Sequence, residues 1–204
     1  MRAPLRTGLL IPAVLFLLSS CGPLTPSPPA NPAPAAVSDS PEDRKAAGEP
    51  AAALRQKIRQ QLAADNYPAA LALVLGSGLS EEEVAEEHGR ALKGVLKQAE
   101  GYLEKDLPEK AGPLYRAALD GYPKTPAVAA RVGTRPAGIT SGIETCADQL
   151  MERGLAAYRN GNLDQAITDW KLIRDFAPQH QASRKALQTA EVQLANLKKV
   201  RAEQ

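Results

Sequence analysis

The chain has little of what enzymes and disulfide-stabilised domains depend on. Its 204 residues include two cysteines, two histidines and one tryptophan, and aromatic side chains make up only 4%. Two cysteines cannot form a disulfide framework. The motifs GxSxG, HExxH, GxGxxG and the P-loop are missing. We therefore expect neither enzymatic activity nor a metal or other cofactor.

Two further deficits narrow the class of protein. Runs of alternating β-branched residues are absent, while alanine is abundant, which favours close-packed helices over strands. Charge of one sign does not dominate, because 25 basic side chains face 23 acidic ones for a net charge of +2. Such a balance gives no strong attraction to nucleic acid, so we expect no nucleic-acid partner.

The first residues have the layout of a secretory signal. A basic start precedes an apolar run at 8–18, which is too short for the ~20 residues that span a bilayer. The run ends in LSSC, with the cysteine at Cys21. This arrangement resembles the lipobox of bacterial lipoproteins. The resemblance implies that residues 1–20 are removed and that Cys21 carries acyl chains such as palmitate. An ordinary secretory signal that happens to contain a cysteine is the alternative.

The segment after the cysteine predicts a spacer. Residues 22–50 contain eight prolines, and such a tract favours extended, polyproline-like conformations over a packed core. We expect residues 21–50 to form a disordered tether on the membrane side of a folded domain at 51–204. A proline-rich ligand for an adaptor domain is the alternative. In the lipoprotein resemblance, Gly22 in place of Asp favours the outer membrane, facing the periplasm.

A helical hairpin at 142–178 organises the rest of the chain. Each of its two helices has a small residue where the helices face each other, and an Asn-Gly-Asn turn connects the helices. In the second helix a tryptophan follows the small residue by four positions, and a proline ends the helix. These positions are Gly154, Gly161, Ala166, Trp170 and Pro178. The spacing resembles a tetratricopeptide repeat (TPR), whose period is ~34 residues. One hairpin cannot bury its apolar side alone, so we expect neighbours.

Two more hairpins and a final helix complete the expected fold. Residues 81–123 match the repeat at Ala99, Tyr102, Ala111, Tyr115 and Pro123, and residues 51–77 are a divergent copy. Residues 180–200 predict an amphipathic closing helix, with a short dimer seam as its alternative. The prediction is an all-α protein in which TPR-like hairpins form a short α-solenoid. A short helix at 126–132 should be followed by a loop rich in turn formers, so that 126–146 is an insertion and 133–146 a surface loop, hinge or flap.

The TPR resemblance implies a partner-binding concave surface lined by the first helix of each hairpin. The matching residues are Arg55, Gln56, Arg59, Lys93, Leu96, Lys97, Glu100, Met151, Glu152, Leu155 and Tyr158. They predict a groove that is basic at one end and apolar at the other, suited to a segment of an envelope protein with acidic and apolar residues. The resemblance therefore implies a non-enzymatic adaptor. A lipoprotein that binds a small ligand between the insertion and this surface is the alternative.

Three isolated residues have competing interpretations. His88 follows two glutamates and is expected on a solvated acidic helix face, although a metal site with Glu83 or Glu87 is conceivable at helical spacing. Cys146 is expected to be a small, partly buried residue, and a disulfide between two chains is its alternative. His180 has no acidic neighbour in sequence, so it suggests no site.

Overall fold

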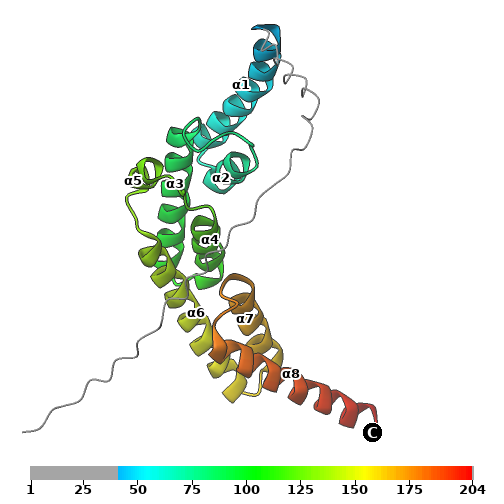
Figure 1. The fold of residues 1–204 in the computed structure, drawn as a ribbon. Helices are drawn as coiled ribbons and strands as arrows, with labels where there is room; N and C mark the ends of the chain where they lie inside the picture. Colours follow the sequence, from blue (N-terminus) through cyan, green and yellow to red (C-terminus); the bar gives the residue numbers. More distant parts are fainter. Residues whose placement is uncertain (1–40, 204) are drawn as a thin grey trace, which may run out of the picture. The chain divides into compact units, whose positions relative to one another are not determined.

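The computed structural model describes the backbone of residues 41–203, and their side chains from residue 51 onward. This part of the chain contains eight α-helices and no strand, which confirms the predicted all-α class (Figure 1). No helix within it is long and apolar enough to cross a bilayer. The expected signal segment, Cys21 and most of the expected tether lie outside the described residues.

The helices pair in chain order. They are α1 (Pro41–Ala63), α2 (Tyr67–Leu75), α3 (Ala85–Leu103), α4 (Pro108–Asp120), α5 (Pro126–Val132), α6 (Pro136–Arg159), α7 (Leu163–Phe176) and α8 (Gln181–Ala202). The pairs α1–α2, α3–α4 and α6–α7 pack internally, and α2–α3, α4–α6 and α7–α8 join successive pairs. The short helix α5 packs on α3 (Figure 1).

The turns inside the three pairs share one backbone conformation. Each has a single residue with positive φ, Asp65 at 55°, Asp106 at 55° and Gly161 at 76°. The next amide donates to the carbonyl five residues back, which is the Schellman motif that closes a helix C-terminus. These bonds are Asn66 N to Gln61 O at 2.9 Å, Leu107 N to Tyr102 O at 3.0 Å and Asn162 N to Ala157 O at 2.9 Å.

Aromatic rings packed on glycines hold helices close together. Trp170 of α7, only 1% exposed, lies against Gly154 of α6, where any Cβ would overlap the indole. Tyr115 of α4 lies in the same way against Gly142 of α6. The remaining predicted repeat positions are buried, except that Tyr102 is half-buried and Gly161 and Pro178 are exposed. The indole and phenol rings therefore fill the space that the missing side chains leave.

The expected loop at 133–146 is wrong. Gly133, with φ 81°, ends α5 as predicted, but α6 begins three residues later with Pro136 in its first turn. Residues 141–144, which fall within the expected loop, lie inside α6. Burial of Ile139, Ile143 and Cys146 outweighs the turn-forming tendency of the nearby glycine and serine. Proline suits a first helical turn, because it lacks only an amide that would have no partner there.

The boundary of the expected tether also needs correction. α1 begins at Pro41, so residues 41–50 are helical rather than extended. The prediction counted prolines and overlooked that the sequence EDRKAA after Pro41 consists mainly of good helix formers. Pro41 again occupies a position where proline starts a helix.

Ser80 and Glu83 form a capping box, but it starts a turn and not α3. Ser80 N donates to the Glu83 carboxylate at 2.9 Å, and Glu83 N donates to Ser80 Oγ at 3.3 Å. Residues 81–84 then form a separate turn, and α3 begins at Ala85. The turn is held in place by Glu81, which accepts hydrogen bonds from Lys124 N at 2.9 Å and Thr125 N at 2.7 Å at the start of α5.

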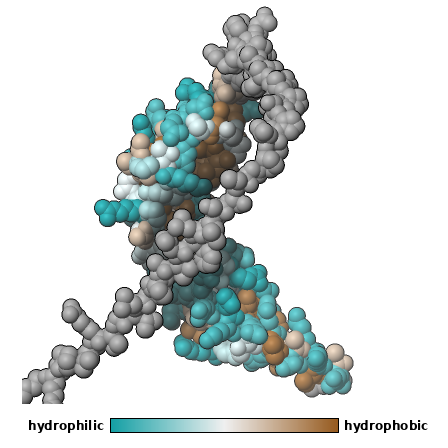
Figure 2. Space-filling model, viewed as in Figure 1, coloured by the Kyte–Doolittle hydropathy of each residue, from teal (hydrophilic) through white to brown (hydrophobic). Residues whose placement is uncertain are grey.

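The final helix, expected at 180–200, extends over Gln181–Ala202. Leu187 and Ala190 are buried, and α8 packs mainly on α7. Its last turns expose Val192, Leu197 and Val200. Figure 2 shows apolar surface gathered around the short helix α2 as well, and Leu75 at the end of that helix is exposed.

Candidate protein-binding surfaces

The two arginines at the basic end of the predicted groove are paired with glutamates. Arg55 pairs with Glu83, with 3.5 Å between Nη2 and Oε1, and Arg59 pairs with Glu87, with 2.9 Å between Nε and Oε1. The Glu87 side chain is 10% exposed, so the second pair is partly shielded from water. Both arginines belong to α1 and both glutamates come from the turn before α3 or its first turn. The two arginines thus join elements of this chain, so of the predicted basic residues only Lys93 and Lys97 remain exposed without such a pair among the described residues.

The α3 portion of the predicted groove is partly filled. Leu96 is 4% exposed and belongs to the core, so it cannot line a binding surface. The helix α5 lies against α3 so closely that a Cβ on Gly89 would be 3.1 Å from Arg131 Cβ. Lys93, Lys97 and Glu100 remain exposed. The error follows from treating α5 as part of an outlying insertion, although it packs on the helix that was expected to line the groove.

The α6 portion is partly covered by α8. Met151, Leu155 and Tyr158 are half-buried, and the Tyr158 hydroxyl donates to Gln193 Oε1 of α8 at 2.6 Å. The Tyr158 ring also lies 5.9 Å from the Trp170 ring, centroid to centroid. Each of the α1, α3 and α6 portions is thus partly occupied by a different neighbouring element of the chain.

His88 is buried rather than solvated. Its side chain is 2% exposed, and Nε2 lies 2.8 Å from the carbonyl oxygen of Gly121, just after α4. The last carbonyls of a helix lack intrahelical partners, so His88 satisfies one of them. Within residues 51–203, no group of three or more His, Cys, Asp and Glu side chains is arranged to hold a metal ion. The solvated-face interpretation is therefore wrong, and His88 joins α3 to α4.

Cys146 is more deeply buried than expected. Its side chain is fully buried in the core, and burial raises the pKa of the thiol to about 11. The thiolate is the form that exchanges disulfides, so this thiol is protected both by access and by its pKa. A disulfide between two folded chains would need this part of α6 to open first.

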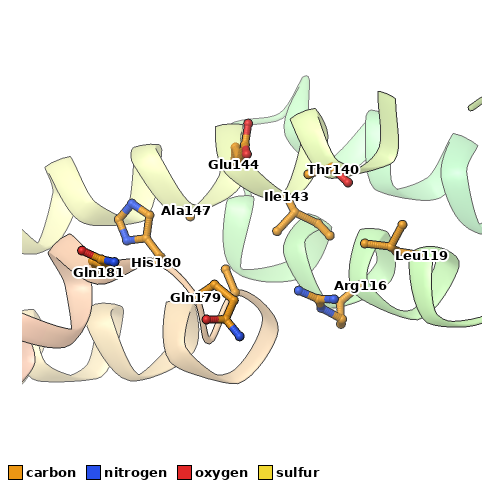
Figure 3. Close-up of a pocket in the computed structure, with 10 residues that line it drawn as sticks. Arg116, Leu119, Thr140, Ile143, Glu144, Ala147, Gln179, His180 and Gln181 are labelled. Atoms are coloured by element: carbon orange, nitrogen blue, oxygen red, sulfur yellow. The ribbon is translucent and has the colours of Figure 1, made fainter. Parts of the chain in front are cut away.

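A pocket that sequence reasoning missed lies between α4, α6 and the turn from α7 to α8 (Figure 3). Its volume is about 340 Å³. Ile143 and Leu119 point toward each other across it, whereas the Glu144 carboxylate points outward. The lining residues are Arg116, Leu119, Thr140, Ile143, Glu144, Ala147, Ala177, Gln179, His180 and Gln181. We call this the α4–α6 pocket.

The pocket exists because α6 is longer than its partner. α7 ends at Phe176, where Arg116 Nε donates to the Phe176 carbonyl oxygen at 2.7 Å. The N-terminal half of α6 packs on α4 and continues beyond this point. His180 caps α8 by accepting from Ser183 N at 3.3 Å, and its other ring nitrogen lies 3.5 Å from Asp148 Oδ1. The turn thereby becomes the third wall of the pocket.

A second pocket, lined by more charged residues, borders α6 further along. It measures about 420 Å³ and is lined by Asp106, Pro108, Asp148, Gln149, Glu152 and Arg153. Arg153 already donates to Glu109 at 3.0 Å and to the buried Asp169 at 2.9 Å. Gln149 Oε1 is buried and has no hydrogen-bond partner among the described residues. We call this the acidic pocket.

One signal in the sequence could have indicated this face. Glu144, Asp148 and Glu152 are spaced four residues apart, which places three carboxylates along one side of a helix. The signal was lost because 133–146 was expected to be a loop.

No protein-family model matches the chain, and no curated protein or solved structure is significantly similar to it. The functional argument therefore rests on the chain's own residues.

Proposed function

We propose that this chain is a non-enzymatic, lipid-anchored adaptor of the bacterial cell envelope. Cys21 carries the lipid, and the protein faces the periplasm from the outer membrane. The folded part is a short TPR-like α-solenoid that binds a segment of another envelope protein. The lipobox-like start and the three helix pairs with one shared turn geometry support this proposal.

The α4–α6 pocket is the binding site that we propose in place of the predicted groove. The observation that carries the proposal is an apolar floor enclosed by a polar rim, built by two neighbouring helix pairs. Ile143 and Ala147 form part of the floor and are buried, while Thr140, Gln179 and Gln181 are exposed at the rim. A pocket that takes one apolar anchor within a polar surround is the usual centre of a protein interface.

Site-specific crosslinking in the native host tests the adaptor function. A photoreactive amino acid replaces Thr140 at the pocket rim, and in a second strain it replaces Thr168. Both threonines are exposed on helices and donate their hydroxyl to the carbonyl four residues earlier, so they are matched. We expect one envelope protein to be crosslinked from position 140 and not from 168. Identical products at both positions would reject the pocket as the site.

The anchor is tested separately. Cells are labelled with an alkyne analogue of palmitate, and the wild-type chain is compared with Cys21→Ser. We expect label and membrane association in the wild type and neither in the variant, because several acyl chains give firm attachment. An unlabelled wild-type chain would contradict the lipoprotein proposal and leave the adaptor proposal standing.

A small-ligand-binding lipoprotein is the second candidate. It is favoured by the pocket volume of about 340 Å³, which lies at the lower end of the range for ligand sites. It is also favoured because Thr140, Ile143 and Glu144 come from the segment expected to flank a ligand. A melting temperature raised by a fractionated metabolite extract in the wild type, and not in Thr140→Trp, would support this candidate.

A further inference from the structure

We propose that the α4–α6 pocket and the adjoining face of α6 bind a basic segment of a partner protein that carries one bulky apolar residue. The apolar side chain enters the pocket, and lysine or arginine side chains follow a row of carboxylates toward the acidic pocket. This inference rests on the proposed adaptor function and names the chemistry of its partner. The basic segment proposed here is opposite in charge to the acidic segment that the sequence predicted as the partner.

The row consists of Glu144, Asp148 and Glu152 on α6. All three residues are exposed, and four helical residues advance ~6 Å along the axis. Glu144 lines the α4–α6 pocket, and Asp148 and Glu152 both line the acidic pocket. The carboxylates therefore lead from one pocket to the other.

Cations near the row are occupied by other partners. Arg153 bridges Glu109 of α4 and Asp169 of α7. Arg116 donates through Nε to the Phe176 carbonyl, and its Nη1 lies 3.4 Å from Asp120. Asp148 lies 3.5 Å from the imidazole of His180, whereas within the described residues neither Glu144 nor Glu152 forms an ion pair. The two ends of the row thus present uncompensated negative charge, and Asp106 adds to it beside Glu152.

The spacing suits an extended partner. Every second residue of an extended chain advances ~6.6–6.8 Å, which is close to the ~6 Å between successive carboxylate-bearing residues on α6. A basic residue at alternate positions would thus meet each carboxylate in turn. An acidic segment would meet repulsion along the whole row, and a neutral apolar segment would use only the pocket.

Binding of defined peptides to the full-length chain tests this chemistry. The first fluorescent peptide has phenylalanine followed by lysines that alternate with serines. The second carries glutamates in place of the lysines, and the third carries alanine in place of phenylalanine. We expect the first peptide to bind and the others to bind at least about tenfold more weakly. Raising the salt to about 0.5 M should weaken the first peptide, because exposed charges are then screened.

Paired variants locate the contact. Glu144→Lys combined with Glu152→Lys should weaken the basic peptide about tenfold. The control reverses two other exposed carboxylates, Glu86 and Glu203, and should leave the affinity within about twofold. Thr140→Trp should block the anchor, whereas the matched Thr168→Trp should not. Circular dichroism of every variant establishes that the helices are retained.

The outcomes separate this inference from the adaptor function. Tighter binding of the acidic peptide, or equal loss in both charge-reversed variants, overturns the basic-partner chemistry. If position 140 still crosslinks one envelope protein in that case, the adaptor function stands with a partner of other chemistry. If all three peptides fail to bind and position 140 captures nothing, both proposals fall.

Discussion

The two halves of α6 use the same packing device for different purposes. In the C-terminal half, Gly154 receives Trp170 from α7, the next helix in the chain. In the N-terminal half, Gly142 receives Tyr115 from α4, which belongs to the preceding pair. The first contact closes a hairpin, and the second joins hairpins. Because α7 has already ended beside the N-terminal half, the second contact leaves the α4–α6 pocket open.

We infer from this difference that the C-terminal half of α6 contributes mainly to stability and the N-terminal half mainly to binding. The C-terminal half is enclosed by α7 and, through Tyr158 and Gln193, by α8. The N-terminal half presents the exposed Thr140 and Glu144 at the pocket. We therefore expect substitutions in the first region to cost folding free energy, and rim substitutions in the second to change binding.

The largest effect is expected from Trp170→Ala. The side chain is 1% exposed, so its removal should leave a cavity and lower the free energy of unfolding by ~3–5 kcal/mol. Urea titration followed by far-ultraviolet circular dichroism measures this, since the variant has no tryptophan fluorescence. Leu197→Ala is the control, because Leu197 is 43% exposed and should cost less than about 0.5 kcal/mol. Equal midpoints for the two variants would refute the central role of Trp170.

Gly142→Ala should have the next largest effect. A Cβ there would lie 2.8 Å from the Tyr115 ring, and such overpacking costs ~1–3 kcal/mol. Gly101→Ala is the matched control in α3, where no atom lies within 4 Å of the new Cβ. Alanine should stabilise that helix by ~0.5–1 kcal/mol. Opposite signs for the two Gly-to-Ala changes would establish that Gly142 is a packing position.

The rate at which the Cys146 thiol is chemically labelled is a second measure of the contact between Gly142 and Tyr115. Its buried thiol, with a pKa raised to about 11, should react with a disulfide reagent only when the N-terminal half of α6 opens. In a Cys21→Ser background, Gly142→Ala should speed this labelling by about tenfold, while Gly101→Ala should leave it unchanged or slower. Fast labelling of the unaltered fold at pH 8 would show that Cys146 is not protected.

The smallest effect is expected at Glu81, in the turn before α3 that binds the start of α5. Hydrogen bonds from Lys124 and Thr125 lower the pKa of Glu81 from 4.5 to about 2. A lowered folded-state pKa stabilises the fold above the ordinary value. This contribution should be complete above pH 4.5 and lost as the pH falls toward 2. Thermal melts across that window should show a smaller acid-induced decrease in Glu81→Gln than in the wild type. An identical decrease in both would exclude Glu81 as a source of the acid sensitivity.

Much of the helical framework could be predicted, and most of the binding surface could not. Leu163, Ala166, Trp170 and Ile173 follow the spacing of one helix face, and their partners lie in the helix just before them. His88 and the two arginines of α1 look exposed on any local pattern, and their burial or pairing depends on Gly121 and on two glutamates that are distant in sequence. Leu96, by contrast, follows the apolar spacing of its own helix, and it was the repeat alignment that placed it in the groove.

The sequence by itself determined the helical class, the three turns and the small-to-aromatic contact inside the last hairpin. These depend on backbone preferences and on side chains that are neighbours along the chain. Only the tertiary structure decided that 136–146 continues α6, that α5 lies on α3 and that a pocket opens beside an acidic row. Those outcomes depend on contacts between elements far apart in sequence, where burial of Ile139, Ile143 and Cys146 overrides the local preference for turns.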